Sequence, residues 1–338
     1  MSRLDSMNTA RYNYGTSILA AFEYLLDHYP EVFVIGQGLW SPWYVGNSMT
    51  NLDKKYGVQR IIDTPVSESA CTGAAVGAAL AGMKPIVVHP RMDFMLYAMD
   101  AVVNQAAKWS HMFGGQANAG LTIRGIINRG GEQGAQHSQA LHSWFAHIPG
   151  LRVVMPATVA DARDLLIASV LCKDPVVYID DRWLYDQQDE LPPVRELDLA
   201  SEGPACLRHG ADITVVTSGY STKLALDVAK SLYEENKISV ELVDLRVLNP
   251  FKPELIVESV RKTGRLLVID GGWRTAGFAA EVMSSLIERI NPSVLLCSPQ
   301  RITLPDAPAP TSHALERVYY PTSALISETI KYTLGSHL

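Results

Sequence analysis

A carboxylate, Glu68, stands where a short apolar segment gives way to a long run of small residues. Ile61 to Asp63 has the pattern of a strand and Thr64-Pro65 that of a turn, so Glu68 falls in the first turn of a predicted helix. There it can simply offset the helix macrodipole. It can also act as an acid, because small apolar neighbours exclude water and favour the protonated carboxyl group.

The helix that Glu68 opens carries a face without bulky side chains. Gly73, Gly77 and Ala81 recur at four-residue spacing, which places them on the same side of the helix. A second helix or a ligand can therefore lie directly against this face.

Two ring-bearing residues follow further along the chain. Phe94 starts a predicted helix, where it either packs into the core or stacks on a flat ligand. His137, preceded by Gln136, comes directly after the Gly-rich segment 128–134. An imidazole there is either a surface residue or a proton donor at the mouth of a site. The Gly-rich segment lacks the Lys of a phosphate-binding loop, so we predict a lid.

Two further candidates for ligand contact lie at the end of the predicted strand Pro85 to His89. His89 and Arg91 are at or just beyond its carboxyl end, which is where ligands bind in open α/β sheets. The planar guanidinium of Arg91 matches a carboxylate or a phosphate. We therefore expect a substrate with a second anionic or polar group; a salt bridge to another subunit is the alternative role for Arg91.

Apolar segments that alternate with helical patterns predict the framework for these side chains. Because the segments are continuously apolar, they indicate a parallel sheet covered on both faces. The predicted strands of this first unit are 32–35, 61–63, 85–89, 121–127, 152–155 and 176–179, with helices starting near residues 14, 68, 94 and 160.

The segment 186–210 loses this periodicity and contains Pro192-Pro193, so we expect an interdomain linker there. A second α/β unit follows it. Its predicted strands are 213–217, 239–244, 266–270 and 294–297, and its predicted helices are 222–235, 253–261, 278–290 and 323–334. The predicted fold class is α/β, with two doubly wound domains at 1–185 and 211–338.

Composition narrows the functional classes. The 338 residues are 47% hydrophobic and 19% charged, which suits a folded chain of more than one domain. A formal charge of −6 without Lys/Arg clusters indicates neither nucleic acid nor a membrane surface as a partner. The four cysteines form neither a zinc motif nor a disulfide framework, and the N-terminal residues lack a signal or transit pattern. We therefore expect a cytoplasmic protein.

The run RIIDTPVSESACTGAAVGAALAGMKP resembles the signature of the β subunits of the thiamine-diphosphate-dependent first component of 2-oxo acid dehydrogenase complexes. Further motifs extend the resemblance over nearly the whole chain in the same order: AMDAVVNQAAKWSHMFGG, IRG, AQHSQ, PGLRVVMPAT and GGW. The resemblance implies a pyrimidine-binding domain followed by a domain like the last domain of transketolase.

The resemblance also implies roles for single residues. Glu68 would donate a hydrogen bond from a protonated carboxyl group to the aminopyrimidine ring of thiamine diphosphate. Val66 would line the pyrimidine pocket and Phe94 would stack on the ring. His137 would serve acyl transfer to a lipoyl group and substrate recognition.

The chain departs from the family pattern at four places, one of which is a missing residue near 172–175 that puts a potassium site of the family type in doubt. Gln37 stands where the family usually has a Glu near the aminopyrimidine. The stretch 88–91 replaces Glu, apolar and aromatic residues, and the loop 39–51 differs from the usual Tyr/Gly-rich segment. These departures suggest a β subunit adapted to an unusual substrate.

The family resemblance implies a partner chain. Related enzymes hold Mg²⁺ and the cofactor diphosphate with a Gly-Asp-Gly motif and a later Asn. This chain has no Gly-Asp-Gly, so we expect no metal ligands in it and an α subunit that supplies them. The active site would then lie between chains in an α2β2 heterotetramer.

Three functions stay open. The first is a dehydrogenase β subunit that acts on a 2-oxo acid and passes acyl groups to a lipoyl-bearing acyltransferase. The second uses the same cofactor without the carrier, as a non-oxidative decarboxylase or a ketol transferase acting on a ketose. The third is a catalytically silent chain that scaffolds a partner, and Glu68, Phe94 and His137 argue against it.

Overall fold

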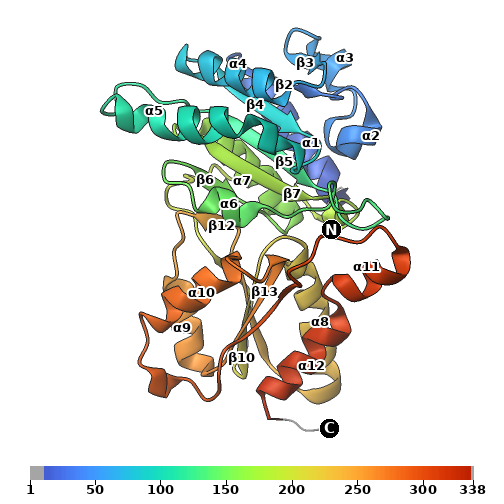
Figure 1. Cartoon of the computed structure of the whole chain (residues 1–338), viewed down its shortest axis with the longest axis vertical. Coiled ribbons are helices and arrows are strands. Elements are labelled where there is room, and N and C mark those ends of the chain that lie inside the picture. Colours follow the sequence, from blue (N-terminus) through green and yellow to red (C-terminus); the bar gives the residue numbers. More distant parts are fainter. Residues whose placement is uncertain (1–10, 336–338) are drawn as a thin grey trace, which may run out of the picture.

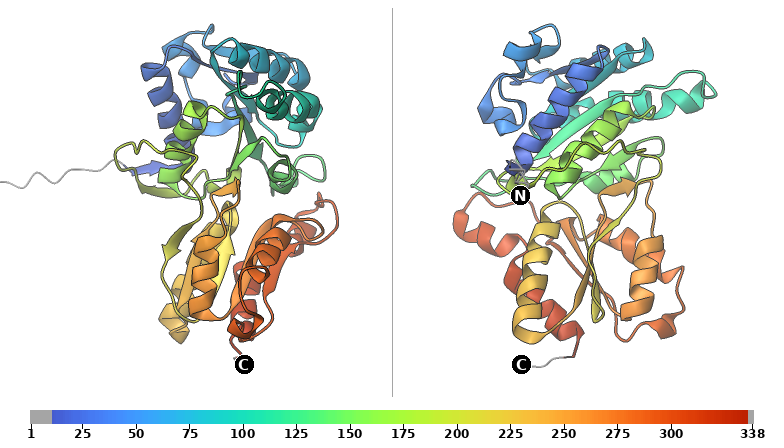
Figure 2. Two further views of the ribbon diagram at one scale, coloured as in Figure 1. Left: turned by 90° about the vertical axis from the view of Figure 1, so that its left-hand side faces the viewer. Right: turned by 180° about the vertical axis from the view of Figure 1, so that it is seen from behind.

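Two α/β units lie end to end along the long axis of the molecule (Figures 1 and 2). This computed structural model describes residues 11–335, so the outermost residues of the two predicted domains, 1–10 and 336–338, lie outside the described residues. The predicted α/β class with two sheet-centred units is confirmed. No helix within 11–335 combines the length and the apolar character needed to cross a membrane.

The first unit is built on a seven-stranded sheet with the order β12-β6-β7-β5-β4-β2-β3. Its strands are β2 (Val32–Gln37), β3 (Ile61–Thr64), β4 (Lys84–His89), β5 (Thr122–Ile127), β6 (Arg152–Val154), β7 (Val176–Asp181) and β12 (Val247–Asn249). All neighbours pair in parallel except β12, which comes from the second half of the chain and runs antiparallel to β6. The central strands β4, β5 and β7 are buried along nearly their whole length, which explains their continuous apolar sequences.

Helices cover both faces of this sheet. On one face α1 (Tyr14–His28) packs against α7 (Val159–Leu171), and α1 starts with a capping box between Asn13 and Thr16. On the other face lie α4 (Glu68–Leu80) and the predicted helix from Phe94. That helix consists of a 3-10 segment (Phe94–Ala98), a π segment (Asp100–Ala106) and α5 (Ala107–Met112). The remaining short helices are α2 (Pro42–Val45), α3 (Leu52–Tyr56), α6 (His142–Ala146) and two 3-10 turns at Gly46–Met49 and Arg182–Leu184.

The second unit has a five-stranded sheet with the order β14-β13-β10-β11-β9. Its strands are β9 (Ala205–Arg208), β10 (Ile213–Thr217), β11 (Val240–Asp244), β13 (Leu266–Trp273) and β14 (Gln300–Leu304). Its helices are α8 (Tyr220–Asn236), α9 (Glu254–Thr263), α10 (Phe278–Ile287), α11 (His313–Tyr319) and α12 (Ser323–Thr333). The strand predicted at 294–297 was wrong: Asn291 accepts a hydrogen bond from Ser293 N and starts a 3-10 turn, and the edge strand begins at Gln300.

The segment 186–210, predicted as a linker, contains two short strands. β8 (Gln188–Glu190) pairs antiparallel with β1 (Arg11–Asn13), and β9 joins the edge of the second sheet next to β11. Both ends of the segment are therefore attached to folded structure. The exact domain boundaries stay a prediction.

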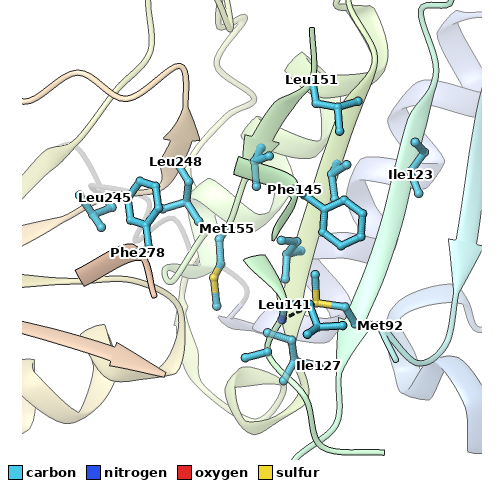
Figure 3. Packing of buried hydrophobic residues seen from close by; sticks show 14 of the residues in the cluster. Met92, Ile123, Ile127, Leu141, Phe145, Leu151, Met155, Leu245, Leu248 and Phe278 are labelled. Atoms are coloured by element: carbon cyan, nitrogen blue, oxygen red, sulfur yellow. Dashed lines mark hydrogen bonds between the residues drawn. The ribbon is translucent and has the colours of Figure 1, made fainter. Parts of the chain in front are cut away.

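One apolar cluster continues from the first unit into the second (Figure 3). Phe145 and Met155 of the first unit lie in the same cluster as Leu245 and Phe278 of the second and Leu248 of β12, and all five are buried. Because the two sheets share this core, elements of the second unit can hold loops of the first in fixed positions.

Candidate active site

A cleft of about 950 Å³ opens beside the carboxyl ends of the first sheet. It is lined by Gln37, Trp43, Tyr44, Val66, Glu68, Arg91, Phe94, Tyr97, Asn128, Arg129, Gly130, Gln133, His137 and Arg182. These residues lie at or beyond the ends of five parallel strands, which is the usual position of a ligand in an open α/β sheet. The volume is at the upper end of the range for small-molecule sites. The structure thus brings together six of the residues predicted from the sequence.

Glu68 is the first residue of α4 and is half-buried at the cleft wall. Its backbone carbonyl accepts a hydrogen bond from Thr72 Oγ1 at 2.8 Å. Within the described residues its carboxylate makes neither a hydrogen bond nor an ion pair, so it can bind a ligand without first losing a protein partner.

Gln37, the last residue of β2, lies next to Glu68 in the wall of a small second cavity as well as in the cleft. Its Oε1 atom is buried and has no hydrogen-bond partner in the part of the chain described. A buried acceptor without a donor costs about 1–3 kcal/mol. This side chain therefore fits a ligand that carries an N–H group beside the Glu68 carboxylate.

Phe94 and His137 meet across the cleft wall. Their rings form an edge-to-face pair with a centroid distance of 5.2 Å and an interplanar angle of 89°. Asp93 fixes the segment after His137, because its Oδ1 accepts hydrogen bonds from Gln139 N at 3.1 Å and from Gln139 Nε2 at 2.9 Å. Burial raises the pKa of Asp93.

The Gly-rich segment 128–134, predicted as a lid, is held at its first two residues and at its tip. Asn128 Nδ2 donates to Pro90 O at 2.7 Å, and Arg129 forms an ion pair with Asp181. At the tip, Glu132 N donates to both carboxylate oxygens of Glu316 in α11, at 3.0 and 3.1 Å. The second unit therefore positions this loop over the cleft.

His89 and Gln136, both predicted to contact substrate, do not line the cleft. His89 is only 3% exposed, and its Nε2 lies 3.2 Å from Thr72 Oγ1 beneath α4. Burial lowers the pKa of His89 to about 4, so the ring is neutral at pH 7. It faces the small cavity shared with Glu68 instead, while Gln136 is exposed outside the cleft.

Sequence reasoning missed several residues of the cleft wall. Asn128 and Arg129 follow β5, and Arg182 follows β7, so each comes directly after a parallel strand. Position at a strand end was the signal that could have identified them. Trp43 and Tyr44 belong to the loop 39–51, whose sequence departs from the family pattern.

The small-residue face of α4 is open, as the four-residue spacing predicted. Gly73, Gly77 and Ala81 are all exposed. A Cβ atom built on Gly73 or Gly77 would meet nothing within 4 Å.

Comparison with known proteins is consistent with this architecture. Residues 11–187 match the family model "Transketolase, pyrimidine binding domain", and residues 205–326 match "Transketolase, C-terminal domain". A split gene transketolase, solved as an inactive beta4 tetramer, has the same fold, with a TM-score of 0.76 at 20% identity over 96% of this chain and 98% of that one.

Curated relatives are closer in sequence. The beta subunit of acetoin:2,6-dichlorophenolindophenol oxidoreductase from Cupriavidus necator is 38% identical over 84% of this chain and 83% of its own length. Subunit beta-1 of the mitochondrial pyruvate dehydrogenase E1 component of Arabidopsis thaliana is 38% identical over 86% and 81%. The beta subunit of the mitochondrial 2-oxoisovalerate dehydrogenase of Dictyostelium discoideum is 36% identical over 84% and 76%.

Proposed function

Because the chain belongs to the family of the β subunits of 2-oxo acid dehydrogenase first components, we propose that it binds thiamine diphosphate and takes part in the decarboxylation of a 2-oxo acid. The observation that carries this proposal is the Glu68 carboxylate next to Gln37 Oε1, both without a partner among the described residues. An acid and an acceptor in adjacent positions suit the ring nitrogen and the amino group of an aminopyrimidine.

The residues present fit the organic half of the cofactor. When bound, thiamine diphosphate supplies the electron sink for cleaving the bond next to a carbonyl group. In this chain Glu68 would hold a proton against the ring nitrogen, Gln37 would accept from the amino group, and Phe94 and Val66 would contact the ring. His137, at the cleft wall, would donate a proton during acyl transfer to a lipoyl-bearing acyltransferase.

The proposal includes an α subunit in an α2β2 heterotetramer, which would provide the Mg²⁺ ligands. The absence of Gly-Asp-Gly from the sequence supports it, as does the open small-residue face of α4, since Gly and Ala allow helices of two chains to approach closely. We place the protein in the cytoplasm, supported by four cysteines that are all free thiols.

Coexpression with the α subunit tests the proposal directly. The complex should show thiamine-dependent turnover of a 2-oxo acid with an artificial electron acceptor, and the isolated β chain should show none. Turnover by the β chain alone would contradict the shared site. Turnover of a ketose, or of a 2-oxo acid without any transfer to a lipoyl domain, would instead support the non-oxidative alternative.

Substitution of Glu68 by Gln tests the role of the carboxyl group. Glu68→Gln should slow hydrogen exchange at the thiazolium carbon by about a hundredfold or more and leave assembly intact, because an amide cannot relay the proton. Glu254→Gln is the matched control, since Glu254 is an exposed carboxylate in the first turn of α9. Equal exchange rates in both variants would reduce Glu68 to a helix-end charge.

A further inference from the structure

Two arginines on the cleft wall lack a negatively charged partner. Arg91 and Arg182 both line the cleft, and within residues 11–335 neither forms an ion pair. The neighbouring arginines differ in this respect, since Arg124 pairs with Asp180 and Arg129 pairs with Asp181. The charges of Arg91 and Arg182 are therefore available to a ligand.

Local contacts orient the Arg182 guanidinium without neutralising it. Arg182 Nη1 donates to Trp43 O at 3.5 Å and Nη2 donates to Tyr44 O. Its Nε atom is buried and has no partner among the described residues. Two carbonyl groups fix the plane of this side chain, while its charge and one donor stay unsatisfied.

Arg91 lies close enough to Arg182 for the two charges to repel each other. Burial and the charge of Arg182 together lower the pKa of Arg91. The charge of Asp93 on the same segment offsets part of this effect, and Asp93 Oδ1 accepts two hydrogen bonds from Gln139. Two cations that repel each other in a partly desolvated wall, neither of them in an ion pair among the described residues, are stabilised when an anion joins them.

We propose that Arg91 and Arg182 together bind a second anionic group of the substrate, a carboxylate or phosphate separate from the carbonyl group that reacts. The guanidinium planes suit either group, because both offer several acceptor oxygens to a fork of N–H donors. The role of this subsite in the reaction rests on the proposed function. Its affinity for an anion does not, because anion binding can be measured without turnover.

Phosphate binding to the full chain alone tests the subsite apart from catalysis. Inorganic phosphate should raise the thermal unfolding midpoint of the wild-type chain in a saturable manner. Arg91→Met and Arg182→Met should each weaken phosphate binding by about tenfold or more, the loss expected for a charge-assisted hydrogen bond. Arg261→Met, in an exposed position on α9, is the matched control and should bind phosphate like the wild type. The same weak, unsaturable response in all four proteins would overturn the proposal.

Kinetics of the complex with the α subunit distinguish the substrate from the cofactor as the source of the anion. Two pairs of compounds differ only in the second charge: 2-oxoglutarate with its neutral 5-amide, and a ketose phosphate with the free ketose. Of 2-oxoglutarate and the ketose phosphate, the compound that the wild type turns over better should show a KM about tenfold higher in Arg91→Met and Arg182→Met. The KM of its neutral analogue should not change. If instead the two variants need a higher concentration of thiamine diphosphate for half-saturation and both KM values are unchanged, the arginines bind the cofactor diphosphate and the proposal is wrong. A complex without turnover that still binds phosphate through both arginines would refute the proposed function and leave the subsite standing.

Discussion

His89→Gln should reduce the loss of stability that the chain undergoes between pH 7 and pH 5. Burial lowers the pKa of His89 from 6.5 to about 4, so the unfolded chain binds this proton at a higher pH than the folded chain. The stability contributed by the neutral ring is present above pH 6.5 and is lost as the pH falls towards 4. Integrated from pH 7 to pH 5 with those two pKa values, the loss is about 2 kcal/mol.

Urea unfolding at the two pH values, followed by tryptophan fluorescence, measures this difference. The free energy of unfolding should fall by about 2 kcal/mol less in His89→Gln than in the wild type. His147→Gln, at an exposed position with no such burial, should behave like the wild type. Equal falls in all three proteins would refute the reasoning. A raised KM for substrate in His89→Gln would return His89 to the role of a ligand contact.

Three further predictions concern the site and the second unit. His137→Ala should impair transfer to a lipoyl domain more than decarboxylation followed with an artificial acceptor; equal losses would make His137 a substrate-binding residue. Glu316→Ala should raise the KM about tenfold by releasing the Glu132 N–H at the loop tip, and unchanged steady-state kinetics would contradict this. Asp244→Asn should stabilise the chain, because burial raises the pKa of Asp244 from 3.8 to about 8. As the pH rises between these two values, the wild type loses stability, because the unfolded chain releases this proton while the folded chain keeps it. The Asn side chain has no such proton, so the variant does not undergo this loss. Unfolding at pH 5 and pH 8 should show the gain growing by about 4 kcal/mol, and a gain independent of pH would count against it.

Strong local patterns predicted most of the framework. The strand before Glu68, the helix that Glu68 opens and the strand that ends at His89 were all predicted within about a residue of their observed limits. Each has an apolar or small-residue pattern that is complete within its own segment. The approach of Glu68, Phe94 and His137 to a common cleft followed from their positions at strand ends and from the family resemblance.

The strand that carries Arg182 to the cleft was harder to predict. It was expected to end at Ile179, but β7 continues to Asp181 and ends directly before Arg182. Asp180 and Asp181 interrupt the apolar pattern, yet both are buried because Arg124 and Arg129 neutralise them. Those partners are more than fifty residues away along the chain, so the local sequence gives no sign of the pairing.

The short strands β1, β8 and β9 were not predicted, for a related reason. β8 has the sequence Gln-Asp-Glu, which has no strand character of its own. It becomes a strand only because Arg11–Asn13 pairs with it. Likewise β12 joins the first sheet from the second half of the chain, and its place there depends on the shared core between the two units.

Within residues 11–335 the second unit contributes no side chain to the cleft, yet it determines the position of the segment that carries the loop and His137. All residues that line the cleft lie between Gln37 and Arg182. Behind them, Arg129 donates to Gly271 O at 3.3 Å, and His142 Nε2 lies 2.8 Å from Asp270 Oδ1. Burial alone would raise the pKa of Asp270, but His142 and two backbone N–H groups hold it below its usual value. Because the His142–Asp270 contact, the Arg129 contact and the Glu132 contact all join residues 129–142 to β13 or α11, changes in those two elements should alter catalysis through the loop without touching the ligand.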